Sequence, residues 1–199
     1  DVRRNKSLDP PAVFKPRRDR AFYSPVDGGE GGGNILVASY NIHKCVGLDG
    51  AFDAARTAEV IKEIDADVIA LQEVDQRFGN RAGLLDLHAL ERDTGLRAVK
   101  TMGAHRSHGW RGNLLLVREG TVTGSRQGAL SGGEPRGALV VDIELSAGPL
   151  RVVAAHLGLL RRSRMRQIKA LLSAAKADEG YPTLLMGDLN EWRLGNRSS

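Results

Sequence analysis

Four short apolar runs, each of which stops at a polar residue, constrain the fold of this chain more than any other feature of its sequence. The runs and the residues after them are Ile35–Tyr40 before Asn41, Asp67–Gln72 before Glu73, Leu150–Ala155 before His156, and Thr183–Met186 before Gly187-Asp188. Runs of this length and composition are typical of buried strands. Strand ends lie close together at the edge of a sheet, so the pattern predicts a site assembled from these polar residues.

Between these runs, apolar residues recur at the spacing of amphipathic helices. Helices are predicted near 54–65, with Asp53 at the N-cap, at about 82–94, closed by Gly95, and at about 161–177. Further strands, joined by glycine-rich turns, are predicted at Leu96–Met102, Asn113–Val117 and Gly137–Leu145, with another candidate at Thr121–Ser125. The order of these elements predicts a mixed α/β domain with helices packed outside a sheet core.

The composition sets the class of protein. With 199 residues, 41% of them apolar and 27% charged, the chain has the make-up of one globular domain. No run approaches the roughly 20 apolar residues of a membrane-spanning helix, so no membrane span is expected. Cys45 is the only cysteine, which excludes an internal disulfide, and no secretion signal is visible at the start. We therefore expect a cytoplasmic protein.

Residues 1–33 differ in amino-acid composition from the rest of the chain. They hold four of the seven prolines, end in a glycine-rich stretch, and carry seven basic and five acidic side chains. Such a segment buries little apolar surface, so we interpret it as a flexible basic arm and glycine-rich linker ahead of a domain over 34–199. The net charge of +5 is shared between arm and domain, which suits an anionic ligand without singling out DNA. Binding of nucleic acid or a membrane by the arm is the alternative to a solvated tail.

The contexts of the strand ends carry a more specific signal. They read Ser39-Tyr40-Asn41-Ile42-His43-Lys44, Leu71-Gln72-Glu73-Val74-Asp75, Ala155-His156-Leu157-Gly158-Leu159 and Gly187-Asp188-Leu189-Asn190-Glu191-Trp192. In this order the four strings resemble the endonuclease/exonuclease/phosphatase superfamily, which includes deoxyribonucleases, apurinic endonucleases, bacterial sphingomyelinases and inositol polyphosphate 5-phosphatases. The resemblance implies an α/β fold of two stacked, mixed and mostly antiparallel sheets flanked by helices, a four-layer sandwich.

The resemblance also implies roles for the strand-end residues. Glu73 would be the principal ligand of Mg²⁺ or Mn²⁺, with Asn41 beside the metal and the phosphate, because hard cations prefer oxygen ligands. His156 would donate to a phosphate oxygen in the transition state. Asp188 and Asn190 would orient or deprotonate the attacking water. Together these roles imply a divalent-metal-dependent phosphoesterase that hydrolyses a phosphomonoester or phosphodiester.

Three further positions follow from the same resemblance. Asn113 and Arg136 lie in strings that look like the family's mid-domain strands, and both are expected to bind phosphate. His43 stands where some members carry a second metal-binding Asp, so a second metal ion is in doubt. The substrate is expected to be a nucleic acid, a phospholipid head group or a sugar phosphate.

The family pattern ordinarily continues beyond the last string, with a final His and the Asp that orients it. No histidine follows Asp188 here, so the general base–orienter pair is missing from the sequence. The chain is therefore expected to lack the last strands of the fold, to be incomplete at its C-terminus and to self-associate through uncovered strands. The alternative function is a truncated, inactive domain that binds a phosphorylated ligand or partner.

A basic cluster, Arg161-Arg162-Ser163-Arg164-Met165-Arg166, opens the third predicted helix. Cations there oppose the helix dipole, so something must offset the cost. A solvated face that attracts anions generally is the explanation we prefer, and a defined phosphate pocket is the other.

Overall fold

The computed structural model describes residues 34–76, 82–102, 106–176 and 181–191. The arm predicted over 1–33 and the chain beyond Glu191 lie outside the described residues. The elements that follow therefore belong to the predicted domain alone.

The first sheet has four strands in the order β1-β2-β4-β3. They are β1 (Val37–Asn41), β2 (Val68–Gln72), β4 (Leu114–Val117) and β3 (Arg97–Ala98). β1 runs parallel to β2, whereas β4 is antiparallel to both β2 and β3. The parallel pair brings the carboxyl ends of β1 and β2 to the same edge.

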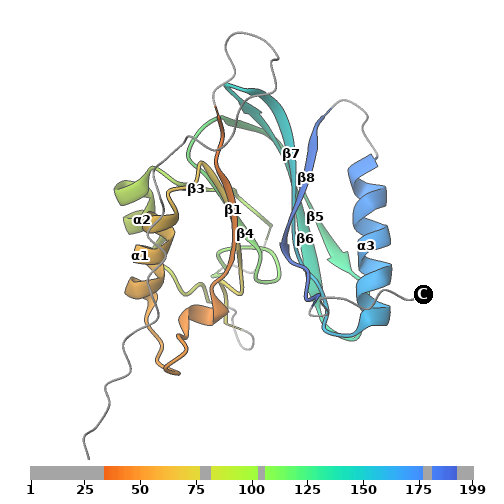
Figure 1. Cartoon of the computed structure of the whole chain (residues 1–199), viewed down its shortest axis with the longest axis horizontal. Helices are drawn as coiled ribbons and strands as arrows, with labels where there is room; N and C mark the ends of the chain where they lie inside the picture. Colours follow the sequence, from red (N-terminus) through yellow and green to blue (C-terminus); the bar gives the residue numbers. More distant parts are fainter. Residues whose placement is uncertain (1–33, 77–81, 103–105, 177–180, 192–199) are drawn as a thin grey trace, which may run out of the picture. The chain divides into compact units, whose positions relative to one another are not determined.

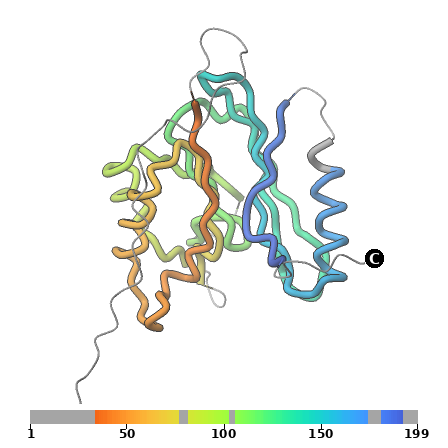
Figure 2. Tube along the Cα trace, in the orientation of Figure 1, coloured from red at the N-terminus to blue at the C-terminus, as the bar shows by residue number. Residues whose placement is uncertain are grey.

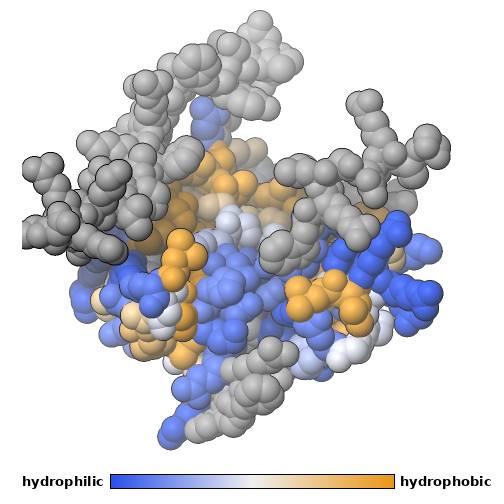
Figure 3. Space-filling model, turned by 60° about the horizontal axis from the view of Figure 1, so that its bottom comes forward, coloured by the Kyte–Doolittle hydropathy of each residue, from blue (hydrophilic) through white to orange (hydrophobic). Residues whose placement is uncertain are grey.

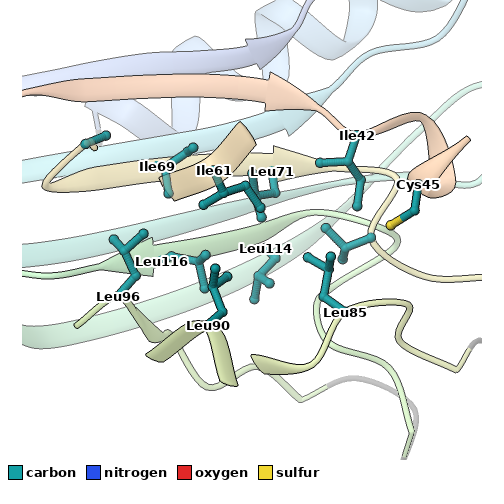
Figure 4. Packing of buried hydrophobic residues seen from close by; sticks show 12 residues of the cluster. Ile42, Cys45, Ile61, Ile69, Leu71, Leu85, Leu90, Leu96, Leu114 and Leu116 are labelled. Carbon is teal, nitrogen blue, oxygen red and sulfur yellow. The ribbon is translucent and has the colours of Figure 1, made fainter. Parts of the chain in front are cut away.

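Helices α1 (Ala54–Ile64) and α2 (Leu87–Thr94) cover the outer face of this sheet (Figure 1). Figure 4 shows Ile61 of α1 and Leu90 of α2 packed among Leu71, Leu114 and other leucines and isoleucines of the sheet. All of these side chains are at most 2% exposed, so the interface is a true core.

The second sheet has the order β5-β6-β7-β8. Its strands are β5 (Thr121–Leu130), β6 (Arg136–Leu145), β7 (Gly148–His156) and β8 (Thr183–Asp188). β5, β6 and β7 form an antiparallel meander, and β8 pairs in parallel with β7. Helix α3 (Arg161–Lys176) supplies the crossover between β7 and β8 and covers the outer face (Figure 1).

The inner faces of the two sheets meet in a second core. Ala70 and Leu115 of the first sheet pack against a cluster that includes Val141, Val152 and Ala154 of the second. Figure 2 shows β1 and β8, far apart in the sequence, running side by side where the sheets approach each other. The predicted four-layer sandwich of mixed, mostly antiparallel sheets is confirmed.

Several local predictions are confirmed as well. The Asp53 carboxylate accepts a hydrogen bond from the backbone N–H of Arg56 and so caps α1. Gly95, with a φ of 74°, ends α2 in the left-handed conformation that glycine adopts at low cost. The candidate strand at Thr121–Ser125 continues to Leu130, because each added residue pairs with β6.

Two predicted boundaries were wrong. The second helix was predicted from about 82, but it begins at Leu87 because Asp86 caps it and Leu84 donates instead to the Val74 carbonyl. The strand predicted over Leu96–Met102 is reduced to two residues. Beyond it, Val99 still donates to the Leu115 carbonyl of β4, but the backbone of Met102 bonds to the side chain of Gln127 in β5.

The strands at the sheet edges differ in burial from those in the middle. β2 and β4 are buried throughout, whereas most residues of the edge strands β1 and β8 are only half-buried. Among the described residues, none of the helices has the length and apolar character needed to cross a membrane.

Candidate active site

The carboxyl ends of β1, β2, β7 and β8 meet at one edge of the molecule. Parallel pairing places Asn41 of β1 opposite Gln72, the residue before Glu73, and places His156 of β7 opposite Asp188 of β8. Because β1 lies beside β8, these residues converge from both sheets. Rigid strands therefore hold the polar side chains that the sequence pattern singled out.

Asn41 links the two sheets. Its Nδ2 donates to Asp188 Oδ2 over 2.9 Å and lies 3.5 Å from Glu73 Oε1. Its Oδ1 accepts the backbone N–H of His43 over 2.9 Å. The side chain thus orients two carboxylates with its nitrogen while its oxygen holds the turn that follows β1.

His156 is held in one tautomer by Arg136. A guanidinium nitrogen of Arg136 lies 3.0 Å from His156 Nδ1, and a guanidinium can only donate, so Nδ1 must accept. The imidazole is then neutral with its proton on Nε2, which lies 3.6 Å from Asp188 Oδ2. Burial lowers the pKa of His156 and the charge of Arg136 lowers it further, which keeps the ring neutral near pH 7.

Asp188 is an ionised acceptor. Burial raises its pKa, but hydrogen bonds from Asn41 and from the backbone N–H of Asn190 outweigh this effect, so the pKa lies below its ordinary value. The Asn190 side chain is buried and donates to the Leu157 carbonyl over 2.7 Å. Asn190 therefore joins the loop after β8 to the loop after β7.

Glu73 has a cationic partner. The Lys44 ammonium lies 2.5 Å from Glu73 Oε2, and the side chains are 40% and 19% exposed, respectively. Burial raises the pKa of Glu73, but the hydrogen bond and the charge of Lys44 bring it below its ordinary value. Glu73 is thus a carboxylate at the mouth of the site.

Backbone strain gathers at these residues. Of the seven described non-glycine residues with positive φ, only Asp65, at the C-cap of α1, lies away from the site. The others are His43, Lys44, Cys45, Glu73, Arg111 and Asn190. Left-handed conformations at such residues cost about 1–3 kcal/mol each and are retained where the surroundings enforce them, often at functional sites.

A pocket of about 270 Å³ opens beside Glu73 and His156, whereas Asn41, Asp188 and Asn190 do not line it. It is lined by Lys44, Glu73, Asp75, Gln76, Arg111, Gly112, Glu134, Pro135, Arg136 and His156. Figure 3, which brings the carboxyl ends of the central strands forward, shows a hydrophilic middle flanked by apolar patches. Three cationic side chains and the N–H of His156 could donate to a phosphate, whereas the acidic groups Glu73, Asp75 and Glu134 in the same lining leave the pocket without a net positive charge.

The model of the Endonuclease/Exonuclease/phosphatase family matches residues 38–198. The chain belongs to this family. Solved structures agree in fold: an endonuclease/exonuclease/phosphatase from Beutenbergia cavernae DSM 12333 has a TM-score of 0.61 at 24% identity, over 82% of this chain and 49% of that one. No curated protein matches the chain.

Two other solved structures are similar in fold. D. rerio TDP2, complexed with a single-strand DNA product, has a TM-score of 0.62 at 17% identity, over 80% of this chain and 62% of that one. ANGEL2, a 2',3'-cyclic phosphatase in complex with adenosine-2',3'-vanadate, has a TM-score of 0.57 at 18% identity, over 78% of this chain and 53% of that one. The chain thus spans about half to three-fifths of the length of these proteins.

Within this family domain, Asn113 is not placed as a phosphate ligand. The residue is fully buried, and its Nδ2 donates to the carbonyls of Trp110 and Gly137 over 3.2 and 3.1 Å. It ties the loop before β4 to the start of β6. Arg136, by contrast, lines the pocket, although Glu134 and His156 already engage its two terminal nitrogens.

The basic cluster at the start of α3 divides into two kinds of residue. Arg161, Arg162 and Arg166 are exposed, as the solvated-face explanation expects. Arg164 is only 8% exposed and donates to the Leu159 carbonyl over 2.6 Å, so it is neither a solvated charge nor a phosphate ligand. Together with Gln167, whose Oε1 accepts the N–H of Gly158, it fixes the loop after His156.

Four charged pocket residues had no predicted role: Lys44, Asp75, Arg111 and Glu134. Asp75 is buried, accepts the N–H of His108 over 2.7 Å, and has no partner for Oδ2 among the described residues. Glu134 binds Arg136 and the N–H of Leu159. In the sequence, Asp75 follows Glu73 by two residues in the string Gln72-Glu73-Val74-Asp75. This spacing could have marked Asp75 as a second acidic residue of the site.

The metal that the family implies can be tested against these side chains. No group of three or more His, Cys, Asp or Glu within the described ranges is arranged to hold a metal ion. A zinc site would need such a group, but Mg²⁺ and Mn²⁺ can be bound through one or two carboxylates, with water and phosphate oxygens completing the shell. Glu73 and Asp188, both oriented by Asn41, fit that requirement. Asn41 itself directs its N–H groups, rather than its Oδ1, towards them.

Proposed function

We propose that this protein is a divalent-metal-dependent phosphoric ester hydrolase, which splits a phosphomonoester or phosphodiester by attack of water. The observation that carries the proposal is the junction at Asn41, where one side chain orients Glu73 and Asp188 from different sheets. Beside this junction, His156 is neutral and presents an N–H. Membership of the family supports the same reaction class.

The metal site is proposed at Glu73, with Asp188 within reach. Mg²⁺ or Mn²⁺ bound there would supply positive charge to the phosphate oxygens and act as a Lewis acid. Asn41 keeps Glu73 oriented, and the strained backbone at Glu73 aims the carboxylate into the pocket.

The remaining roles fall to the residues of β7 and β8. His156 would donate its Nε2–H to a non-bridging phosphate oxygen, an interaction that strengthens as negative charge builds there. Asp188, held ionised, would accept a proton from the attacking water as the new P–O bond forms and the bond to the leaving oxygen breaks. Asn190 fixes Asp188 and the neighbouring loop, while Arg136 fixes the tautomer of His156.

The proposed substrate is a nucleic acid, a phospholipid head group or a sugar phosphate. The TDP2 structure holds a single-strand DNA product and the ANGEL2 structure holds adenosine-2',3'-vanadate, which favours a nucleotide phosphate as the natural substrate.

The experiment compares hydrolysis of p-nitrophenyl phosphate and bis(p-nitrophenyl) phosphate with Mg²⁺, with Mn²⁺ and with EDTA. His156→Gln and Asp188→Asn should each lower turnover by about 10²-fold or more, the scale for losing a transition-state hydrogen bond. His88→Gln is the matched control, because His88 is exposed on α2, away from the pocket. Equal activity in all variants, or activity unaffected by EDTA, would refute the proposal.

A second candidate, a domain that binds a phosphorylated ligand without hydrolysing it, is favoured by one observation. Lys44 already neutralises Glu73, so phosphate could be held by Arg136, Arg111 and Lys44 alone. Inorganic phosphate that binds equally well in EDTA and in Mg²⁺, with no turnover of either ester, would support this candidate.

A further inference from the structure

Lys44 occupies an unusual position in the pocket. Its ammonium contacts Glu73 Oε2, the carboxylate that the proposed function assigns to a divalent metal. Glu73 Oε1 faces Asn41, so the cation sits on the oxygen that points away from the sheet junction. A metal ion on that oxygen would face the ammonium at short range, where like charges repel strongly.

The backbone beneath Lys44 is fixed. The turn η1 (His43–Cys45) has three successive residues at φ of 50°, 56° and 59°. The Asn41 side chain accepts the N–H of His43 at its start, and Cys45 is buried in the core at its end. The Cα of Lys44 is therefore held, whereas its four-carbon side chain, 40% exposed, can change direction.

The ion pair is not needed to hold Glu73 in place. Gln72, the residue before Glu73, is paired with β1 in the sheet. The N–H of Val74, the residue after Glu73, donates to the Gly112 carbonyl. The pair joins two neighbouring loops at the pocket mouth rather than two layers of the fold.

The other pocket cations are already engaged. Arg136 is bound to Glu134 and His156, and Arg111 donates to the Arg136 carbonyl and lies over the Trp110 ring. Lys44 differs from both arginines, because the metal would take its anionic partner, Glu73. Its side chain is then the one that can turn towards an arriving phosphate.

We propose that Lys44 is an internal counter-ion of Glu73, which a divalent metal must displace, and that the displaced ammonium then binds a phosphate oxygen of the substrate. This inference rests on the proposed function, since it assumes a metal at Glu73. It makes metal binding and phosphate binding mutually reinforcing: metal releases Lys44 for the phosphate, and phosphate keeps Lys44 away from Glu73.

The test is calorimetry with Mg²⁺ and inorganic phosphate as probes. Lys44→Met should bind Mg²⁺ about tenfold more tightly than the wild type, because the competing cation is gone. In saturating Mg²⁺, the same variant should bind phosphate about tenfold more weakly. Lys44→Arg, which keeps a cation, should not gain Mg²⁺ affinity.

Lys62→Met is the matched control. Lys62 pairs with Glu59 and Asp93 at the outer helices, so both affinities should stay at the wild-type values. Thermal unfolding of each variant shows whether the fold is kept, and Lys44→Gln provides a second neutral variant if Lys44→Met unfolds.

The outcomes separate the two proposals. If Glu73→Gln abolishes Mg²⁺ binding while Lys44→Met leaves Mg²⁺ affinity unchanged or weaker, the Lys44 inference is wrong and the metal site stands. If phosphate affinity in Mg²⁺ is the same with and without Lys44, the second half of the inference fails. If Glu73→Gln binds Mg²⁺ like the wild type, or if neither the wild type nor Lys44→Met binds it, the metal site and the inference fall together.

Discussion

Replacement of Arg164 by Met tests how the loop after His156 is held. Met retains an apolar, flexible stem, so the substitution removes mainly the guanidinium and its hydrogen bonds. Arg164 donates to the Leu159 carbonyl over 2.6 Å and reaches the Gly158 carbonyl at 3.5 Å. Its bond to Glu191, whose side chain is 62% exposed, contributes little because water screens it.

The expected loss follows from these contacts. One short charge-assisted hydrogen bond, from the buried Arg164 guanidinium to the partly exposed loop after β7, contributes about 1.5–3 kcal/mol, and the bond at 3.5 Å adds little. Relief from burying the guanidinium offsets part of this loss. We expect the free energy of unfolding to fall by about 2 kcal/mol, which lowers Tm by about 4–8 °C for a domain of this size.

Arg166→Met is the control, because Arg166 lies on the same helix and is exposed. It should change the free energy of unfolding by no more than about 0.5 kcal/mol. Urea unfolding of both variants gives the difference, and amide exchange at Gly158 and Leu159 should quicken only in Arg164→Met. Equal stability of the two variants would show that Arg164 does not hold this loop, despite its burial.

Three further outcomes are expected. The Arg151 guanidinium holds the pKa of Asp142 below its ordinary value of 3.8, so the pair contributes its full stability above about pH 4 and loses it as the pH falls through the lowered pKa. In Asp142→Asn, the free energy of unfolding should therefore fall less steeply below pH 4 than in the wild type. An equally steep fall in both proteins would exclude this pair as the cause. Asn113→Ala should lower the free energy of unfolding by about 1–3 kcal/mol in chemical denaturation, because the buried bond of its Nδ2 to the Gly137 carbonyl is lost together with a partly buried one to Trp110; a neutral result would show that Asn113 does not tie Trp110 to Gly137. The half-buried edge strands β1 and β8 should recruit a second copy, so sedimentation velocity at tens of micromolar should show a dimer, and a clean monomer would show that these edges are protected.

The sequence predicts the strand ends well because their signal is local. A buried apolar run followed by a polar residue specifies both the strand and the place where it ends. That pattern predicts Asn41, Glu73, His156 and Asp188 at one edge, and strand pairing brings them there in the structure. The two boundaries that were wrong, at α2 and β3, lie where backbone N–H groups bond outside the predicted element: Leu84 to the Val74 carbonyl and Met102 to the Gln127 side chain.

What the sequence could not show depends on conformation. Lys44 reaches Glu73 because His43, Lys44 and Cys45 all take the left-handed conformation. None of these three residue types predicts such a turn. Arg164 is one of four arginines in a short stretch of sequence, and its residue type alone does not set it apart. Its spacing of four and seven residues from Ile168 and Leu171 places it on their buried helical face, and this spacing could have predicted its burial. Asn113 resembles a ligand in sequence, but its donors are used within the fold.

The most direct test of the account is a crystal structure of the protein soaked in Mn²⁺, with diffraction recorded at the manganese absorption edge. The proposed function predicts an anomalous peak in the pocket, within coordinating distance of a Glu73 oxygen, and a Lys44 side chain turned away from that carboxylate. The peak should vanish in Glu73→Gln crystals of the same form. A pocket without a peak at saturating Mn²⁺, or a peak bound elsewhere with the Lys44–Glu73 pair intact, would contradict a metal-dependent reaction at this site.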